Sequence, residues 1–173
     1  VFGCESSFDV YARGLSRPAV ATNPNLRSAG FHIHFGNDKL INNNEAMEKL
    51  VKLFDKYVTL PSMLIDPEQG RRELYGRAGE FRMKPYGLEC RQLGSFFLSD
   101  FRYIEWVWEG VEKCITQFEN GENLNANLMF TRNDLDETCT IENIINSYDL
   151  EAAQKFCDEN NIPYKKTGKL LIA

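Results

Sequence analysis

Three short stretches of the chain alternate apolar and polar residues, and this period of two constrains the fold more than any other feature. They read GFHIHFG at 30–36, GEFRMK at 79–84 and GLECRQL at 87–93. Successive side chains of a strand point to opposite faces of its sheet, so each stretch predicts a strand with one apolar and one polar face. The turn residues at 85–87 join the last two stretches and predict a hairpin or two successive strands.

Other apolar residues recur at helical spacing and predict helices that pack behind the apolar face of the sheet. One helix is expected from Asn44, which can cap it, to Pro61, which should end it. A longer helix should start with Ser99 as its N-cap and stop at Gly121. We expect its apolar stripe to be core, and this stripe comprises Phe101, Ile104, Val107, Trp108, Val111, Cys114, Ile115 and Phe118. Trp106 lies off the stripe and should meet a neighbouring element or a partner.

The last third of the chain carries weaker patterns. Residues 122–140 have little periodicity, so we expect an irregular connection there. Two short helices are expected at 140–147 and 150–160, the second with Asp149 as its N-cap. The tail, residues 164–173, is expected to add a strand.

Length and composition agree with one globular domain, because the chain has 173 residues, 43% of them hydrophobic, and a net charge of -5. We therefore expect an α+β fold over residues 1–173, with 122–173 as a helical extension. The acidic balance argues against a protein whose whole surface binds nucleic acid or an anionic membrane. No apolar run approaches the ~20 residues of a membrane span. The cysteines form no C-x-x-C pair, so we expect neither a disulfide framework nor a zinc site, and a cytoplasmic setting fits best.

Both histidines of the chain lie in one predicted strand. His32 and His34 are two residues apart, so the pleat sends both imidazoles to the same face. This arrangement suits ligand binding. The alternative is that two histidines on the polar face of an edge strand simply contact water.

A second concentration of charge lies at residues 71–91. It contains six cations, Arg71, Arg72, Arg77, Arg82, Lys84 and Arg91, and three carboxylates, Glu73, Glu80 and Glu89. One interpretation is a solvated face with cross-strand ion pairs, each worth about 0.2–1 kcal/mol. The other is a site for an anionic ligand, because guanidinium groups match the oxygens of phosphate and carboxylate. A carboxylate of this segment together with His32 could also hold Mg²⁺.

These segments resemble a known family. HIHFG, RRELYGRAGEFRMKPYGLECR and the following FF-x-L are similar to phage-type carboxylate-amine ligases, the phiEco32-like amidoligase type 2 group of the glutamine synthetase superfamily. The resemblance covers roughly residues 1–120. It implies a glutamine synthetase-like antiparallel or mixed sheet whose polar concave face binds ATP, Mg²⁺ and a carboxylate, which an amine then attacks through an acyl phosphate. For a phage protein the setting would be the host cytoplasm.

The resemblance also implies roles for individual residues. His32 and Glu89 would ligate the metal, while His34, Arg77, Arg82 and Lys84 would contact the nucleotide. Arg82 and Arg91 would act in catalysis, Arg82 on the transferring γ-phosphoryl group and Arg91 on the substrate carboxylate or the acyl phosphate.

Several readings remain open at this stage. One histidine and one glutamate are few ligands for two or three Mg²⁺ ions. The chain, which starts at Val1 without a clean first element, is therefore expected to be the C-terminal portion of a longer enzyme, or to share its site with a partner chain or a second copy. Alternatively, it is a catalytically inactive binding or assembly protein, phage-related, that keeps the ligase fold. A third reading is a metal protein that is not a ligase. Convergence of His32, Arg82, Glu89 and Arg91 would favour the ligase.

Overall fold

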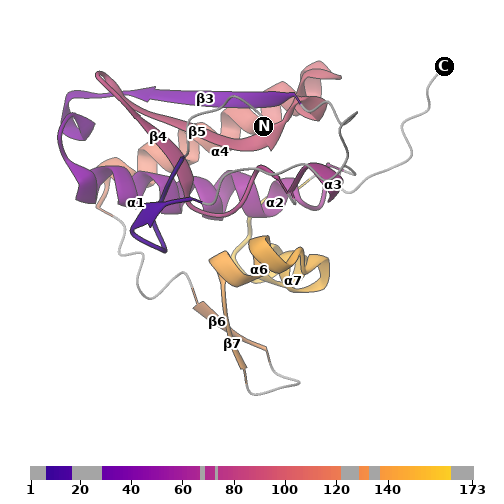
Figure 1. Cartoon of the computed structure of the whole chain (residues 1–173). Coiled ribbons are helices and arrows are strands. Elements are labelled where there is room, and N and C mark those ends of the chain that lie inside the picture. The colour runs from indigo at the N-terminus through magenta and orange to yellow at the C-terminus, as the bar shows by residue number, and fades with distance from the viewer. Residues whose placement is uncertain are drawn as a thin grey trace.

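A computed structural model of the protein describes residues 7–16, 29–66, 69–72, 74–121, 129–132 and 137–164. Its central element is a five-stranded sheet with the order β2-β1-β4-β5-β3, in which each neighbouring pair is antiparallel. The strands are β1 (Phe8–Asp9), β2 (Gly14–Leu15), β3 (Gly30–Gly36), β4 (Glu80–Lys84) and β5 (Gly87–Gly94). Helices lie beside this sheet (Figure 1), which confirms the predicted α+β class.

The β4–β5 hairpin and β3 form the centre of the sheet, as the alternating patterns predicted. Glu89 on β5 is paired with Arg82 on β4 and with His34 on β3, so these polar residues lie side by side across three strands. Gly87 permits the close approach of β3 and β5: its φ is +146°, and a Cβ there would lie 2.1 Å from the Phe35 carbonyl oxygen. Only glycine tolerates both conditions.

One helical run covers the apolar face of the sheet. It begins with α1 (Asn44–Phe54), capped by Asn43, continues through a π-helical turn, η2 (Asp55–Thr59), and ends in α2 (Leu60–Ser62). Two of the predicted limits were wrong by a small margin, since Asn43 rather than Asn44 is the N-cap and Pro61 lies within α2. Proline is tolerated in the first turn of a helix, where its missing N–H has no partner.

The second covering helix, α4 (Phe101–Glu119), packs on α1 and η2, and its N-cap is Asp100 rather than Ser99. The predicted core stripe was wrong in part, since Phe101, Ile104, Trp108 and Ile115 are exposed. Trp106 meets a neighbouring element, as predicted. Trp106 is 3% exposed and stacks on Phe97, whereas Trp108 is 60% exposed. The helix buries Tyr103, Trp106, Val107, Val111 and Cys114. Its apolar residues extend around more than one face, and the sheet and α1 cover only part of them.

The C-terminal part contains α6 (Ile141–Ser147) and α7 (Leu150–Glu159), close to the predicted helices. Asp149 caps α7 as predicted, and Thr140 caps α6. The prediction of an irregular connection at 122–140 was wrong for the described residues of that segment. There β6 (Met129–Arg132) and β7 (Glu137–Thr140) form an antiparallel hairpin. Cross-strand pairing thus produces strands where the local pattern is weak.

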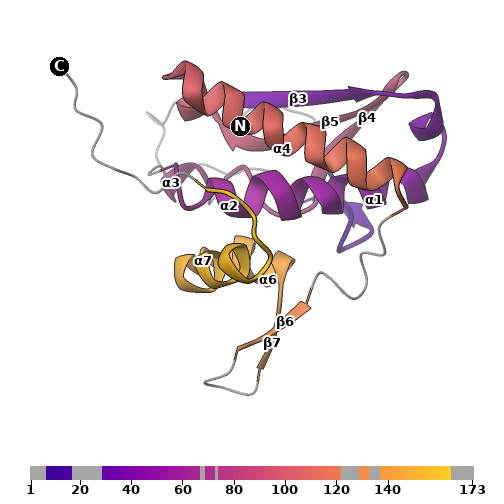
Figure 2. The ribbon, with the colours of Figure 1, turned by 180° about the vertical axis from the view of Figure 1, so that it is seen from behind.

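Helices α6 and α7 pack beneath α2 (Figure 2) around a second apolar core that includes Leu60, Ile144 and Phe156. Shorter helical turns complete the fold at η1 (Asp38–Leu40), α3 (Gln69–Arg72) and η3 (Ser95–Leu98). The strand expected in the tail lies outside the described residues, except for Tyr164, which is in no strand. Among the described helices, none is long and apolar enough to span a bilayer. The single-domain assignment stays a prediction.

Candidate functional site on the polar face of the sheet

Glu89 is the centre of a charged cluster on the polar face of β3, β4 and β5. Its carboxylate lies 2.6 Å from the Lys84 Nζ, 3.1 Å from the His32 Nδ1 and 3.3 Å from the Arg91 Nε. The Arg82 Nη1 lies 3.9 Å from the same carboxylate. The strand register brings these side chains together, because residues paired across antiparallel strands share a face.

The pKa of Glu89 depends on its burial and on the cations around it. The side chain is only 4% exposed. Burial by itself would raise the pKa of Glu89, but the hydrogen bond and charge of Lys84, with the charges of His32 and Arg82, hold this pKa below its ordinary value. Glu89 is therefore an ionised carboxylate in a nearly closed environment.

The two histidines lie at the more open side of the cluster. Burial lowers the pKa of His32, and the positive charge of Arg91 lowers it further. The negative charge of Glu89 acts in the opposite direction but is the smaller effect, so the imidazole favours its neutral form. The His34 Nδ1 lies 2.6 Å from the Tyr86 hydroxyl in the β4–β5 turn. One ligand atom from each of His32, His34 and Glu89 can be chosen so that all three lie within 4.8 Å of one another.

Arg91 lies two residues after Glu89 on β5 and shares its polar face, and a bulge follows it. Phe31 pairs with Leu93 but Ile33 pairs with Cys90, so Arg91 and Gln92 lie opposite His32. The extra residue returns Leu93 to the apolar face, since a shift of one residue exchanges the faces of a strand.

Two side chains hold the bulge and Arg91. The Arg71 guanidinium donates hydrogen bonds to the carbonyl oxygens of Arg91 at 3.3 Å and Gln92 at 2.9 Å. Ser7 accepts a hydrogen bond of 3.0 Å from the Arg91 Nη1. A Cβ added to Gly30 would touch both the His32 Nε2 and the Arg71 Nη2, so Arg71 reaches the edge of the cluster.

Arg71, Ser7 and Tyr86 carry no individually predicted role. Arg71 could have been found by its place in the cationic segment, and Tyr86 by its place in the turn beside Lys84. No local pattern points to Ser7, which lies 84 residues from Arg91.

The structure does not bring Arg77 into contact with the cluster within the described residues. Its exposed side chain precedes β4, and its charge acts on Glu80 and on Glu142 at the start of α6. The other predicted site residues, His32, His34, Arg82, Lys84, Glu89 and Arg91, all belong to the cluster or border it.

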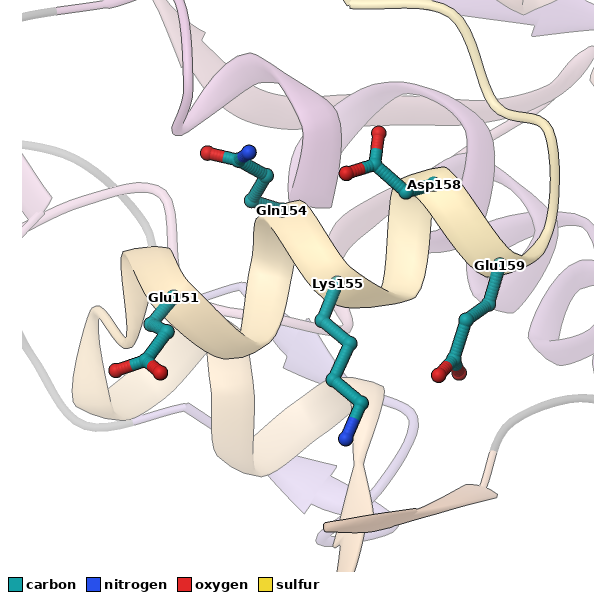
Figure 3. Close-up of a pocket in the computed structure, with 5 residues that line it drawn as sticks. All are labelled: Glu151, Gln154, Lys155, Asp158 and Glu159. Carbon is teal, nitrogen blue, oxygen red and sulfur yellow. The ribbon is translucent and has the colours of Figure 1, made fainter. Parts of the chain in front are cut away.

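A surface hollow over α7 is separate from this site. It is lined by Glu151, Gln154, Lys155, Asp158 and Glu159, all from one helix. Figure 3 shows Gln154 and Asp158 on one side of α7 and the other three side chains on the other side. They do not converge on a shared point, so the hollow is no candidate site.

A known protein family matches the part of the chain that contains the cluster. The family described as phage phiEco32-like COOH.NH2 ligase-type 2 matches residues 20–106, which is half of the chain. The matched segment includes both histidines, Arg71 and all charged residues of the hairpin around Glu89. No curated protein and no solved structure matches the chain. On the extent of this match, the chain belongs to the phage phiEco32-like COOH.NH2 ligase-type 2 family.

Proposed function

We propose that this chain carries the acyl-activation site of an ATP-dependent carboxylate-amine ligase that works through an acyl phosphate. The observation that carries the proposal is the convergence of His32, Glu89, Arg82 and Arg91, from three adjacent strands, on one face of the sheet. Membership of a COOH.NH2 ligase family supports the reaction class.

In the proposed reaction, a carboxylate oxygen attacks the γ-phosphorus of ATP, and the bond from that phosphorus to ADP breaks. The amine nitrogen then attacks the acyl carbon, phosphate leaves, and the nitrogen loses a proton. Negative charge develops on the phosphoryl oxygens during the first step, and preorganised cations stabilise it. Arg82 and Lys84 would supply this charge, and His34 would lie beside the phosphates. A peptide or small molecule would supply the carboxylate, and a second substrate the amine.

Arg91 is suited to hold the substrate carboxylate or the acyl phosphate. Its guanidinium is fixed between Glu89 and Ser7, so little side-chain entropy remains to be lost when it binds. Arg71 would keep Arg91 in place through the bulge. Arg77 as a nucleotide contact stays a prediction, and any such contact would lie towards Glu80.

The donor set fits a divalent cation such as Mg²⁺. His32 and Glu89 would hold it, and His34 is near enough to contribute a third ligand. The fit rests on a neutral imidazole and an ionised carboxylate whose ligand atoms lie together. When bound, the cation would neutralise phosphate charge. Further ligands would come from elsewhere in a longer chain, from a second copy or from a partner.

One observation favours a second candidate, a catalytically inactive binding or assembly protein. Glu89 already pairs with Lys84 and Arg91, so its charge is compensated within the chain. In that case the cations would bind an acidic partner without phosphoryl transfer.

Two measurements test the proposal: titration with a non-hydrolysable ATP analogue in the presence of Mg²⁺, and ATP-dependent hydroxamate formation from carboxylates with hydroxylamine. We expect Glu89→Gln to weaken Mg²⁺-dependent binding by at least about 10–100-fold, the loss caused by removing a group that only orients a metal ligand. Glu119→Gln is the matched control, because Glu119 is an ion-paired glutamate on α4, bonded to Lys39.

Nucleotide binding or hydroxamate formation that is indifferent to Glu89→Gln would contradict the assigned site. Binding of acidic peptides without nucleotide binding would favour the second candidate. Binding of the ATP analogue that depends on Glu89, together with hydroxamate formation, would support the ligase.

A further inference from the structure

The outward face of α4 exposes an apolar stripe that no described residue covers. Phe101, Ile104, Trp108 and Ile115 are all exposed, with Trp108 at 60%. Their spacing of three, four and seven residues places them on one side of the helix. From Phe101 to Ile115 the helix rises by 14 residue steps, or about 21 Å at about 1.5 Å per step.

An acidic row borders this stripe along one side. At about 100° per residue, Glu105, Glu109 and Glu112 lie next to the apolar residues on the helix surface. All three are exposed, and Glu112 accepts a hydrogen bond from the Trp108 indole at 2.9 Å. The exposed face of α4 is therefore apolar on one side and negative on the other.

The C-terminal segment reaches α4 on its buried side. The Trp106 indole, on the buried side of the helix, donates a hydrogen bond of 3.0 Å to the Pro163 carbonyl oxygen. Between Trp106 and the acidic row lie two cations, each directed to its own neighbour: Arg102 to Asp100, and Lys113 to the ring of Tyr57.

In the sequence that follows Pro163, positively charged residues precede apolar ones. Lys165, Lys166 and Lys169 come first, and Leu170, Leu171 and Ile172 follow. Going around α4 from Trp106 over the exposed side, Arg102 and Lys113 come first, the glutamates next and the apolar stripe last. Half the circumference of a helix about 10–12 Å wide is about 16–19 Å, and seven extended residues span about 23 Å. The segment is long enough to cross the helix.

We propose that residues 165–173 pack across the outward face of α4, with the lysines on Glu105, Glu109 and Glu112 and the leucines and isoleucine on the Trp108 stripe. The stripe would otherwise be an exposed apolar patch, and burial of such a patch is favourable. The surface is then a docking site for the protein's own tail. This inference is independent of the proposed ligase activity.

Acrylamide quenching of tryptophan fluorescence in the full chain tests the proposal, because Trp108 lies on the stripe and Trp106 is buried. Replacing Leu170, Leu171 and Ile172 by serine is expected to raise the quenching constant and to shift the emission to the red. Replacing the three lysines by glutamate is expected to do the same, and the further change of Glu105, Glu109 and Glu112 to lysine should restore protection.

Trp108→Phe is the matched control, since the tail changes should leave the signal of the remaining Trp106 unaltered. Quenching that stays the same in both tail variants would overturn the proposal. So would protection of Trp108 that increases with protein concentration and ignores the tail, because a second copy of the chain would then cover the stripe.

Discussion

Burial of the Asp55 carboxyl group should make the folding stability of the protein depend on pH. Asp55 lies on the side of the sheet away from the cluster. It is fully buried in the π-helical turn η2. Its carboxylate accepts a hydrogen bond of 2.7 Å from the Gly79 backbone N–H. Burial raises the pKa of Asp55 from 3.8 to about 7, although the nearby Thr59 hydroxyl, the Gly79 N–H and the Tyr11 hydroxyl act in the opposite direction.

The sign of the resulting pH dependence follows from proton binding. Between pH 4 and pH 7 the folded protein keeps this proton while the unfolded chain has lost it, so folding stability falls as the pH rises through this range. Above pH 7 the contribution is constant. The difference between the two pKa values corresponds to about 4 kcal/mol, at about 1.4 kcal/mol per pKa unit.

Asp55→Asn isolates this contribution, because asparagine keeps an oxygen that can accept the Gly79 hydrogen bond but does not ionise. We expect the free energy of unfolding of the variant relative to the wild type to increase by up to about 4 kcal/mol from pH 4 to pH 8. Urea unfolding at several pH values measures it. Asp38→Asn, at an exposed carboxylate of η1, is the control for the loss of an aspartate. A difference between Asp55→Asn and wild type that does not change with pH would refute the reasoning.

Two further substitutions test the geometry that positions the cluster. Gly87→Ala should destabilise the protein by about 3 kcal/mol or more, since the added Cβ would overlap the Phe35 carbonyl oxygen at a positive φ; a loss below about 1 kcal/mol in urea unfolding would contradict the close strand approach. Arg71→Gln should cost about 1.5–3 kcal/mol because it removes charged hydrogen bonds to the Arg91 and Gln92 carbonyls, and Arg71→Lys should restore part of it. Equal stability of wild type and both Arg71 variants would show that the bulge needs no such support.

Local patterns predicted much of the fold correctly. The period of two identified the strands around His32 and Glu89 and the faces on which their side chains lie, because the pleat links neighbouring residues directly. Asp149 was recognised as the N-cap of α7, since its oxygen bonds a backbone N–H only three residues away. The polar face follows from these local rules, and the proposed anionic or metal ligand chemistry rests on them together with the family resemblance.

The bulge and its supports depended on contacts far apart in the chain. Ser7 accepts a hydrogen bond from Arg91, and Arg71 donates hydrogen bonds to the two carbonyl oxygens of the bulge. Arg77 has the same side chain as Arg71, but it precedes β4 and its charge acts on Glu80 and Glu142 instead of the cluster. No spacing rule distinguishes these two arginines.

The sequence by itself determined which residues share a strand face and which can line a helix stripe, because those relations depend on backbone geometry over a few residues. Only the tertiary structure decided which apolar side of α4 is covered, and so which tryptophan is buried. The physical reason is that burial requires a partner surface. On α4, Phe97 of η3 and the backbone at Pro163 provide that surface for Trp106, while Trp108 remains on the outward face.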